Sequence, residues 1–475
     1  MSNTLTRQVA YNTVVQVASK GITTIIGVLT LGLLTRYLGA KGYGEYTTIF
    51  AFLGFFAVIA DFGLFSIIVR EIAKRPEDKE KIFGNILALR IVLALTILVL
   101  PPLVAYFIPQ YNMNIKTGIA IGAFSSFFIL INQAMVAIFQ VNLKMDRFVV
   151  SDTVGRAVIL ALIYYLIKID LGFTPIIFAN AIGNLITVIL SLALASTFIK
   201  IRLYFDWKYW RWVFMESLAL GLVVILGLIY FRTGQVILSL FRGSIEVGIY
   251  GAPYKILEIL ITIPAIFIGS VFPIISRYLA ANDQRLESAL QKSFDFLALM
   301  AFPVVVGVFM TARPVMLLLA GPEFIASVLP LQILIFAIGI IFFGTLAGNA
   351  IIAASLQKKL LKVYIASVIF NITANLIFIP LYSYHAAATI TVLTEVWACS
   401  AAYFIVWKNL NWRPRFGYAL KTVISALIMA GVVYVLKNNN LLLQVTAGAA
   451  SYILTLSLLG GINKDMIKMV SGRVR

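Results

Sequence analysis

The sequence predicts an all-α polytopic membrane protein with about fourteen transmembrane helices: two six-helix halves related by a pseudo-twofold axis, plus two extra C-terminal helices. Three observations predict this fold class. Hydrophobic residues make up 61% of the 475 residues and charged residues only 12%, whereas a soluble globular domain is about half apolar and about a quarter charged. Apolar segments of about 20 residues, long enough to cross a bilayer, recur along the chain. Basic residues also concentrate in alternate loops, as they do in multi-pass proteins.

Each expected span is an apolar segment bounded by charged residues, glycine or proline. The segments cover residues 8–35, 43–69, 83–108, 115–139, 148–168, 174–198, 213–240, 246–275, 291–319, 328–353, 361–380, 386–407, 416–436 and 442–462.

The distribution of lysine and arginine orients these spans. With a cytoplasmic N-terminus, 26 of the 38 basic residues fall in cytoplasmic segments and 6 in external ones. Such an excess on one side follows the positive-inside rule. We therefore expect both termini to be cytoplasmic and the protein to lie in the cell membrane, plasma or inner.

Composition also argues against several classes of site. The single cysteine, Cys399, excludes a disulfide framework, and one histidine, His385, makes histidine-based metal chemistry improbable. The net charge of +19 raises the question of nucleic acid. We attribute it instead to cytoplasmic loops, because no soluble basic domain is present to hold nucleic acid.

A basic and aromatic linker divides the chain after the sixth span. Its sequence, KIRLYFDWKYWRW, ends at Trp212 and is typical of a segment that lies on the inner membrane surface. The predicted domains are therefore an N-terminal six-helix half, an interfacial linker, a C-terminal six-helix half, and two additional helices with a cytoplasmic tail. Their bounds are 1–200, 201–212, 213–410 and 411–475.

An internal repeat supports two halves of the same orientation. The motif Gly39-x4-Gly44-x-Tyr46 follows the first span, and Gly243-x4-Gly248-x-Tyr250 follows the seventh, 204 residues later. Transporters with parallel repeats have this organisation, and their substrate path lies between the halves.

The stretch from Leu31 to Arg70 resembles the start of the polysaccharide flippase family. This family belongs to the superfamily of multidrug, oligosaccharidyl-lipid and polysaccharide transporters. The matching residues are the R-Y-L-G…Y-G-x-Y run from Arg36 to Tyr46, the A-D-F-G-L run from Ala60 to Leu64, and Arg70-Glu71. Resemblance continues over most of the chain. One departure is Arg232-Thr233-Gly234, where family members often carry Arg-x-Asp, so an acid-centred cation or proton site in the seventh span is in doubt.

The resemblance implies a flippase that moves a polyprenyl-linked oligosaccharide from the cytoplasmic to the outer leaflet for surface polysaccharide or glycan assembly. Its expected partners are this substrate, membrane lipids, and glycan polymerases or glycosyltransferases of the same pathway, with no nucleic acid. No cofactor is expected, and coupling to a proton or sodium gradient stays open. The pyrophosphate of such a substrate needs cations to replace its water, so we expect alternating access through a cationic central cavity.

Ionisable residues at membrane depth are the candidates for that cavity, because their burial is costly without a function or a partner. Asparagines at helical spacing are candidates for sugar hydroxyls, with interhelical packing as the alternative. The candidate set is Lys20, Asp61, Arg90, Arg156, Arg232, Lys255, Glu258, Asn375 and Glu395.

Two of these cations have an alternative role in structural pairing. Arg156 follows Asp152 by four residues and Lys255 precedes Glu258 by three, spacings that place each pair on one helix face. Lys20 and Arg232 have no obvious partner on their own helices, which favours a water-filled cavity for them.

Two other functions compete with the flippase. A cation-coupled multidrug-type extruder of the same superfamily needs an acid-dominated cavity, which the cations at depth disfavour. A membrane glycosyltransferase or polymerase usually needs a sizeable extramembrane region, whereas the loops here are short and basic. No nucleotide-binding motif is present to drive transport with ATP. We therefore expect a transporter and not an enzyme.

Overall fold

The computed structural model describes residues 2–461, and within that range every regular element is a helix. The chain divides into two compact units, Met1–Gly251 and Ala252–Arg475. This division falls inside one helix, α8. The predicted domain bounds, which end the first half at residue 200, stay a prediction.

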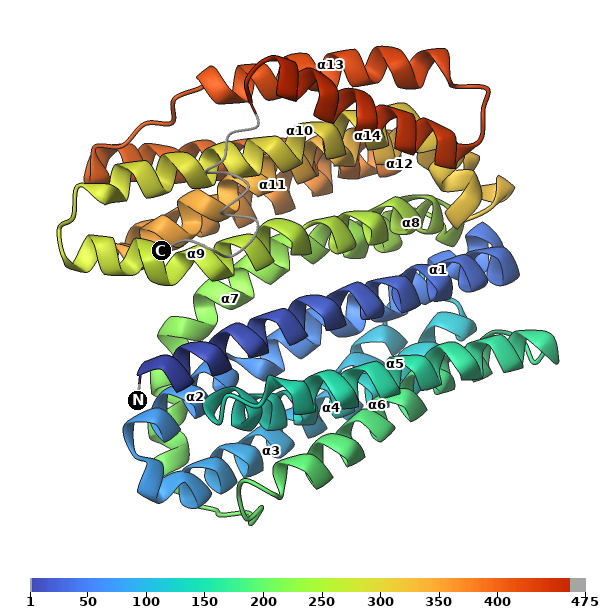
Figure 1. Ribbon diagram of the computed structural model, residues 1–475. Helices are drawn as coiled ribbons and strands as arrows, with labels where there is room; N and C mark the ends of the chain where they lie inside the picture. Colours follow the sequence, from blue (N-terminus) through green and yellow to red (C-terminus); the bar gives the residue numbers. More distant parts are fainter. Residues whose placement is uncertain (1, 462–475) are drawn as a thin grey trace. The chain divides into compact units, whose positions relative to one another are not determined.

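The first unit is a bundle in which α1 packs against α3, α4, α5 and α7, while α6 packs against α4 and α5 (Figure 1). Short α2 contains the end of the second expected span and contacts α3, α4 and α7. The elements are α1 (Ser2–Asp61), α2 (Leu64–Lys74), η1 (Pro76–Asp78), α3 (Lys79–Tyr106), α4 (Met113–Val141), α5 (Met145–Lys168), α6 (Phe173–Ala195), α7 (Trp207–Phe241) and the first turns of α8 (Ser244–Leu260).

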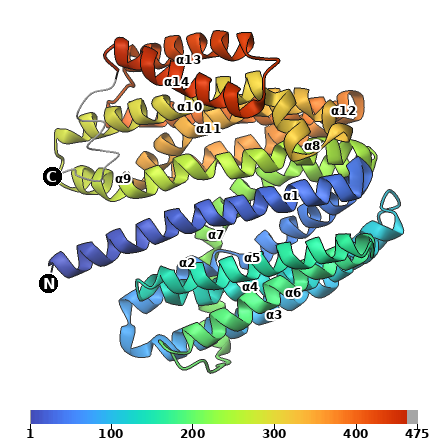
Figure 2. The ribbon, with the colours of Figure 1, turned by 45° about the vertical axis from the view of Figure 1, so that its right-hand side comes forward.

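The second unit is built around α11, which packs against α9, α10 and α12, and Figure 2 shows α13 and α14 beside α10. Tyr452 of α14 fixes this last pair by donating a hydrogen bond from its hydroxyl to the Leu299 carbonyl, 2.9 Å away. The elements are α9 (Thr262–Ala280), α10 (Arg285–Leu319), η2 (Pro322–Ser327), α11 (Val328–Ala353), α12 (Gln357–Leu410), α13 (Gly417–Val435) and α14 (Leu441–Leu458).

Two helices each contain a pair of expected spans. α1 bends at Gly39, whose φ of 63° and ψ of −175° are non-helical, and α12 bends at Ser383, with φ 55° and ψ −137°. In the described part of the chain, 11 helical segments are long and apolar enough to cross a membrane, and two of them measure 57 and 54 residues. The all-α multi-pass architecture is confirmed, and about fourteen spans are compatible with it.

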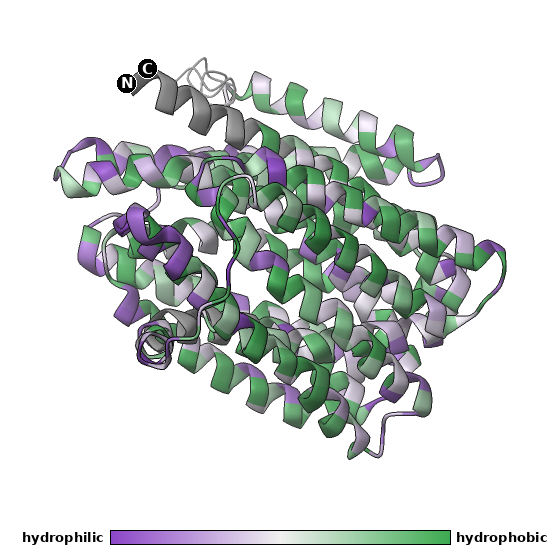
Figure 3. Ribbon diagram, turned by 90° about the horizontal axis from the view of Figure 1, so that it is seen from below, coloured by the Kyte–Doolittle hydropathy of each residue, from purple (hydrophilic) through white to green (hydrophobic). Residues whose placement is uncertain are grey.

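The pattern of buried and exposed side chains is the one expected for a protein surrounded by lipid. Hydrophobic residues run along the helices and many hydrophilic residues lie at their ends (Figure 3). In the first unit, Phe83, Ile138 and Phe139 belong to a fully enclosed apolar core. Large apolar side chains such as Val99 and Leu103 are instead more than half exposed on the outer face of α3. Such exposure suits hydrocarbon as the surrounding solvent.

The two copies of the glycine motif meet inside the first unit. A Cβ added to Gly44 would overlap the carbonyl oxygen of Ser244, and a Cβ added to Gly248 would overlap that of Ala40. Ala40 and Ser244 are themselves 204 residues apart, so each motif meets the other through equivalent atoms. Only glycine allows two backbones to approach this closely. The repeat seen in the sequence is therefore also a reciprocal helix contact.

Candidate functional site

A break in the second expected span places Asp61 beside a buried arginine. Phe62 and Gly63 have φ values of 46° and 76°, which end α1 at Asp61 before α2 begins. There the Asp61 carboxylate forms an ion pair with Nη2 of Arg90, a residue of α3 that is 0% exposed. The same nitrogen donates to Gln133 Oε1 at 3.1 Å. Within the described residues, Nε and Nη1 of Arg90 have no hydrogen-bond partner.

Arg90 is enclosed by the helices of the first unit, whereas the Asp61 side chain is 19% exposed. A guanidinium without solvent contact is stable only if its charge is compensated. A substrate phosphate would have to displace Asp61 in order to reach Arg90. In the structure, Arg90 and Asp61 are therefore ion-pair partners. Their assignment to a substrate cavity stays a prediction.

The other cations of the first unit are more accessible. Lys20 is exposed. Arg156 is 49% exposed and its Nε lies 2.9 Å from Oδ2 of Asp152, so the structural pairing expected from their spacing is confirmed. Arg232 donates from Nη1 to Gln235 Oε1 at 3.4 Å, so the expectation that it lacks a partner on its own helix is wrong. Gly54 of α1 leaves room opposite: its Cβ would lie 3.9 Å from Arg232 Nε.

The candidates of the second unit form two groups. Lys255 Nζ and Glu258 Oε2 are 2.7 Å apart, with the lysine side chain 48% exposed, which confirms the second expected pair. Asn375 is buried and donates to Oδ1 of Asn371 at 3.0 Å, and Asn371 donates to Thr394 Oγ1 across the α12 bend, also at 3.0 Å. These bonds bring Asn375 near the turn of α12 that carries the buried Glu395.

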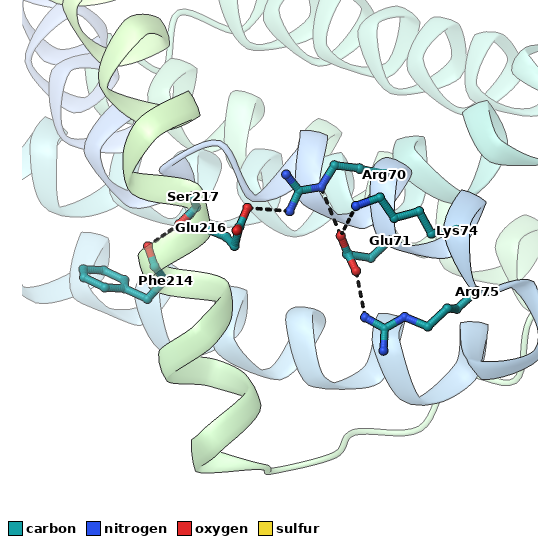
Figure 4. Close-up of polar contacts among 7 residues, drawn as sticks. All are labelled: Arg70, Glu71, Lys74, Arg75, Phe214, Glu216 and Ser217. Carbon is teal, nitrogen blue, oxygen red and sulfur yellow. Dashed lines mark hydrogen bonds and ion pairs between the residues drawn. The ribbon is translucent and has the colours of Figure 1, made fainter.

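The sequence interpretation missed the role of Glu71 as the centre of a charged cluster (Figure 4). Its carboxylate is 2% exposed and is contacted by Arg70 Nε at 3.0 Å, Arg75 Nη2 at 2.9 Å and Lys74 Nζ at 3.6 Å. Arg70 Nη2 also reaches Glu216 Oε2 at 2.8 Å, which connects α2 to α7. The sequence does contain a signal for this cluster, because three cations lie within four residues of one acid, a spacing that indicates ion pairing at a helix end.

Two pKa values outside the spans reflect this cluster. The hydrogen bond to Glu71 raises the pKa of Arg75 above its ordinary value. Burial raises the pKa of the neighbouring Tyr209 phenol to about 12. At neutral pH the arginine is therefore charged and the phenol neutral, so the cluster holds fixed charges.

A second buried acid, Glu45, was also missed. It lies one residue after Gly44 and accepts hydrogen bonds from Nδ2 of Asn112 at 2.7 Å and of Asn114 at 3.2 Å. These amides come from the start of α4 and hold it to α1. Among the described residues, no group of three or more acidic, histidine or cysteine side chains is arranged to hold a metal ion.

Comparison with known proteins connects this arrangement to a family. A family model described as "Polysaccharide biosynthesis protein" matches residues 9–279, which is more than half of the chain. The chain belongs to this family. The resemblance inferred from the sequence motifs is thereby confirmed.

Two relatives extend the match. A probable low-salt glycan biosynthesis flippase, Agl15, of Haloferax volcanii is 23% identical over 413 residues, covering 86% of this chain and 85% of the relative. A putative O-antigen transporter of Shigella flexneri is 23% identical over 312 residues, covering 62% of this chain and 72% of the relative.

Solved structures share the fold. The lipid II flippase MurJ in an inward closed conformation matches with a TM-score of 0.79 at 15% identity, covering 96% of this chain and all of the other. A multidrug resistance MATE family transporter of the MOP superfamily matches with a TM-score of 0.65 at 16% identity, covering 84% and 98%. The protein therefore has the fold of these membrane transporters.

Proposed function

We propose that the protein is a flippase that translocates a polyprenyl-linked oligosaccharide from the cytoplasmic to the outer leaflet for surface polysaccharide or glycan assembly. The observation that carries the proposal is the family match over residues 9–279. The names of both relatives agree with it, since one is a probable glycan biosynthesis flippase and the other a putative O-antigen transporter.

The mechanism that we propose is alternating access through a cationic cavity. Lys20, Arg232 and Lys255 are the proposed phosphate contacts, because these cations are exposed or partly exposed. Ammonium and guanidinium groups replace the water around a pyrophosphate through charge-assisted hydrogen bonds. Arg90 is assigned a supporting role, since it is fully buried and already paired with Asp61.

In this proposal both termini are cytoplasmic, as the distribution of basic residues predicts. Glycosyltransferases that build the lipid-linked glycan, and polymerases that use it, are the proposed pathway partners. A proton or sodium gradient is the proposed driving force, because the chain carries no nucleotide-binding motif.

A multidrug-type extruder is the second candidate, and the MATE-like fold favours it. Such a transporter needs acids that attract organic cations. In this chain the Asp61 carboxylate is paired with Arg90 and that of Glu258 with Lys255. Their negative charges are thus compensated, which is why we prefer the flippase.

The sign of the charge at Arg232 separates the two candidates. The experiment compares wild type, Arg232→Lys and Arg232→Glu in vesicles, measuring translocation of a lipid-linked glycan with a cationic dye in parallel. A carboxylate about 4 Å from phosphate, at an effective dielectric of about 20, costs about 4 kcal/mol, or about a thousandfold in binding. We expect graded loss of glycan transport from lysine to glutamate and no dye transport.

The matched control is Lys358→Glu, which reverses an exposed charge at the start of α12 and should leave transport unchanged. Dye transport by wild type without glycan translocation would overturn the proposal in favour of the extruder. Equal glycan transport by wild type and both variants would show that Arg232 does not contact the substrate.

A further inference from the structure

The segment between α6 and α7 is fixed to the start of α3 at three points. Lys79 Nζ donates to the Phe198 carbonyl at 3.0 Å. The Tyr204 amide donates to the Gly84 carbonyl at 3.4 Å, and the Asp206 amide donates to Asn85 Oδ1 at 2.9 Å. Although it contains no regular helix before Trp207, this segment is therefore held in one conformation.

Gly84 and Asn85 make this attachment specific. A Cβ at Gly84 would overlap the carbonyl oxygen of Arg202 and lie 2.6 Å from the Tyr204 ring, so the segment lies directly on the backbone of α3. Asn85 is 1% exposed, and its Nδ2 donates to the Lys81 carbonyl at 3.0 Å, which orients its Oδ1 toward Asp206. The segment cannot move away from α3 without breaking these contacts.

The attachment separates two sides of the segment. Ile199 and Val213 are buried in the apolar core of the first unit, and Tyr209 and Trp210 pack against that core. The opposite side carries large exposed aromatic rings next to exposed cations. This exposed set, here called the linker surface, consists of Lys200, Arg202, Phe205, Trp207, Lys208 and Arg211.

The aromatic rings of the linker surface are unusually exposed. Phe205 is 72% and Trp207 78% exposed, and both rings lie against Trp210, with centroids 5.8 and 6.4 Å away. An exposed ring at the end of a membrane span is favourable at the headgroup level, where its apolar body leaves water. The aromatic rings therefore place the neighbouring cations at the depth of lipid phosphates.

The linker surface carries an excess of positive charge. The segment itself carries four cations and one acid, Asp206, whose Oδ1 accepts a hydrogen bond from the Tyr209 amide at 3.1 Å and caps α7. The 3-10 helix η1 adds Glu77 and Asp78, and the start of α3 adds Glu80 but also Lys79 and Lys81. The cationic excess remains, and juxtamembrane cations attract anionic headgroups.

We propose that the linker surface is a binding site for an anionic phospholipid, with the cations contacting its phosphate and Phe205 and Trp207 contacting its glycerol and upper acyl region. The site is formed by the first unit alone. It does not depend on the identity of the transported substrate.

The test uses full-length protein with a fluorophore on a cysteine at position 205, made as Phe205→Cys in a Cys399→Ser background. The protein is reconstituted in vesicles containing nitroxide-labelled phosphatidylglycerol or phosphatidylcholine at equal mole fraction. We expect stronger quenching by the anionic lipid. Lys208→Gln and Arg211→Gln should each reduce this preference by about fivefold at low salt.

The matched control is the double variant Lys358→Gln/Lys359→Gln, which removes two exposed cations from the start of α12 and should leave quenching at position 205 unchanged. Molar salt should abolish the preference. Equal quenching by both lipids in wild type would overturn the proposal, and so would a preference that neither neutralisation lowers. Absence of quenching by either lipid would show that the linker surface does not contact lipid at all.

Discussion

Removing Arg90 should destabilise the first unit severely, because the change leaves the Asp61 carboxylate inside the bundle without its partner. Arg90→Met keeps the apolar volume of the stem and removes only the charge and its hydrogen bonds. Breaking a buried pair by deleting one partner costs about 3–5 kcal/mol. The range applies here because Arg90 is 0% exposed and the Asp61 side chain that it leaves behind is only 19% exposed.

That cost translates into a measurable shift. For a unit of about 250 residues, each kcal/mol lowers the unfolding midpoint by about 2–4 °C, so Arg90→Met should lose about 6–20 °C. The assay is thermal unfolding of the purified protein in detergent, followed by intrinsic fluorescence. The double variant Arg90→Met/Asp61→Leu should recover most of the loss, since replacing both members of a buried pair is often neutral.

Arg156→Met is the matched control, because its ion pair with Asp152 is half exposed and worth less than about 1 kcal/mol. An Arg90→Met protein that keeps its unfolding midpoint and loses only glycan transport would refute the structural role of this ion pair. That result would return Arg90 to the substrate path.

Three further predictions concern the glycine contact, the Glu71 cluster and the membrane topology. Gly44→Ala should lower the yield of folded protein, because its Cβ overlaps the Ser244 carbonyl; Gly21→Ala, with nothing within 4 Å of its Cβ, should not. Glu71→Gln should lower the unfolding midpoint by several degrees, because three cations lose a buried carboxylate, and an unchanged midpoint would remove the cluster's structural role. In a variant without the native cysteine, Lys79→Cys should react with impermeant reagents only from the cytoplasmic side and Asn438→Cys only from outside. Labelling of position 79 in intact cells would contradict the proposed topology.

Local properties of the sequence were sufficient for the architecture. Apolar length defines a span and basic residues orient it, and both are read without knowing which helices touch. The bend at Gly39 was predictable from the glycine motif, since it needs a backbone conformation that other residues rarely adopt. The pairs of Arg156 with Asp152 and of Lys255 with Glu258 follow from helical spacing alone.

Contacts between segments far apart in the chain could not be predicted from the sequence. Arg90 looked like a cavity cation until α3 was placed against the break after Asp61, 29 positions earlier in the chain. Glu45 gains its amide partners only because the start of α4 lies beside α1. Hydropathy identifies a costly charge but not the side chain that compensates it.

The sequence by itself determined that this chain is a multi-pass helical membrane protein of a polysaccharide biosynthesis family, because composition, span length and short motifs are local quantities. Only the tertiary structure decided which charges are compensated, how the two glycine motifs meet, and which side of the segment after α6 stays exposed. Those facts depend on packing, where the energy of a buried charge is set by neighbours far away in the sequence.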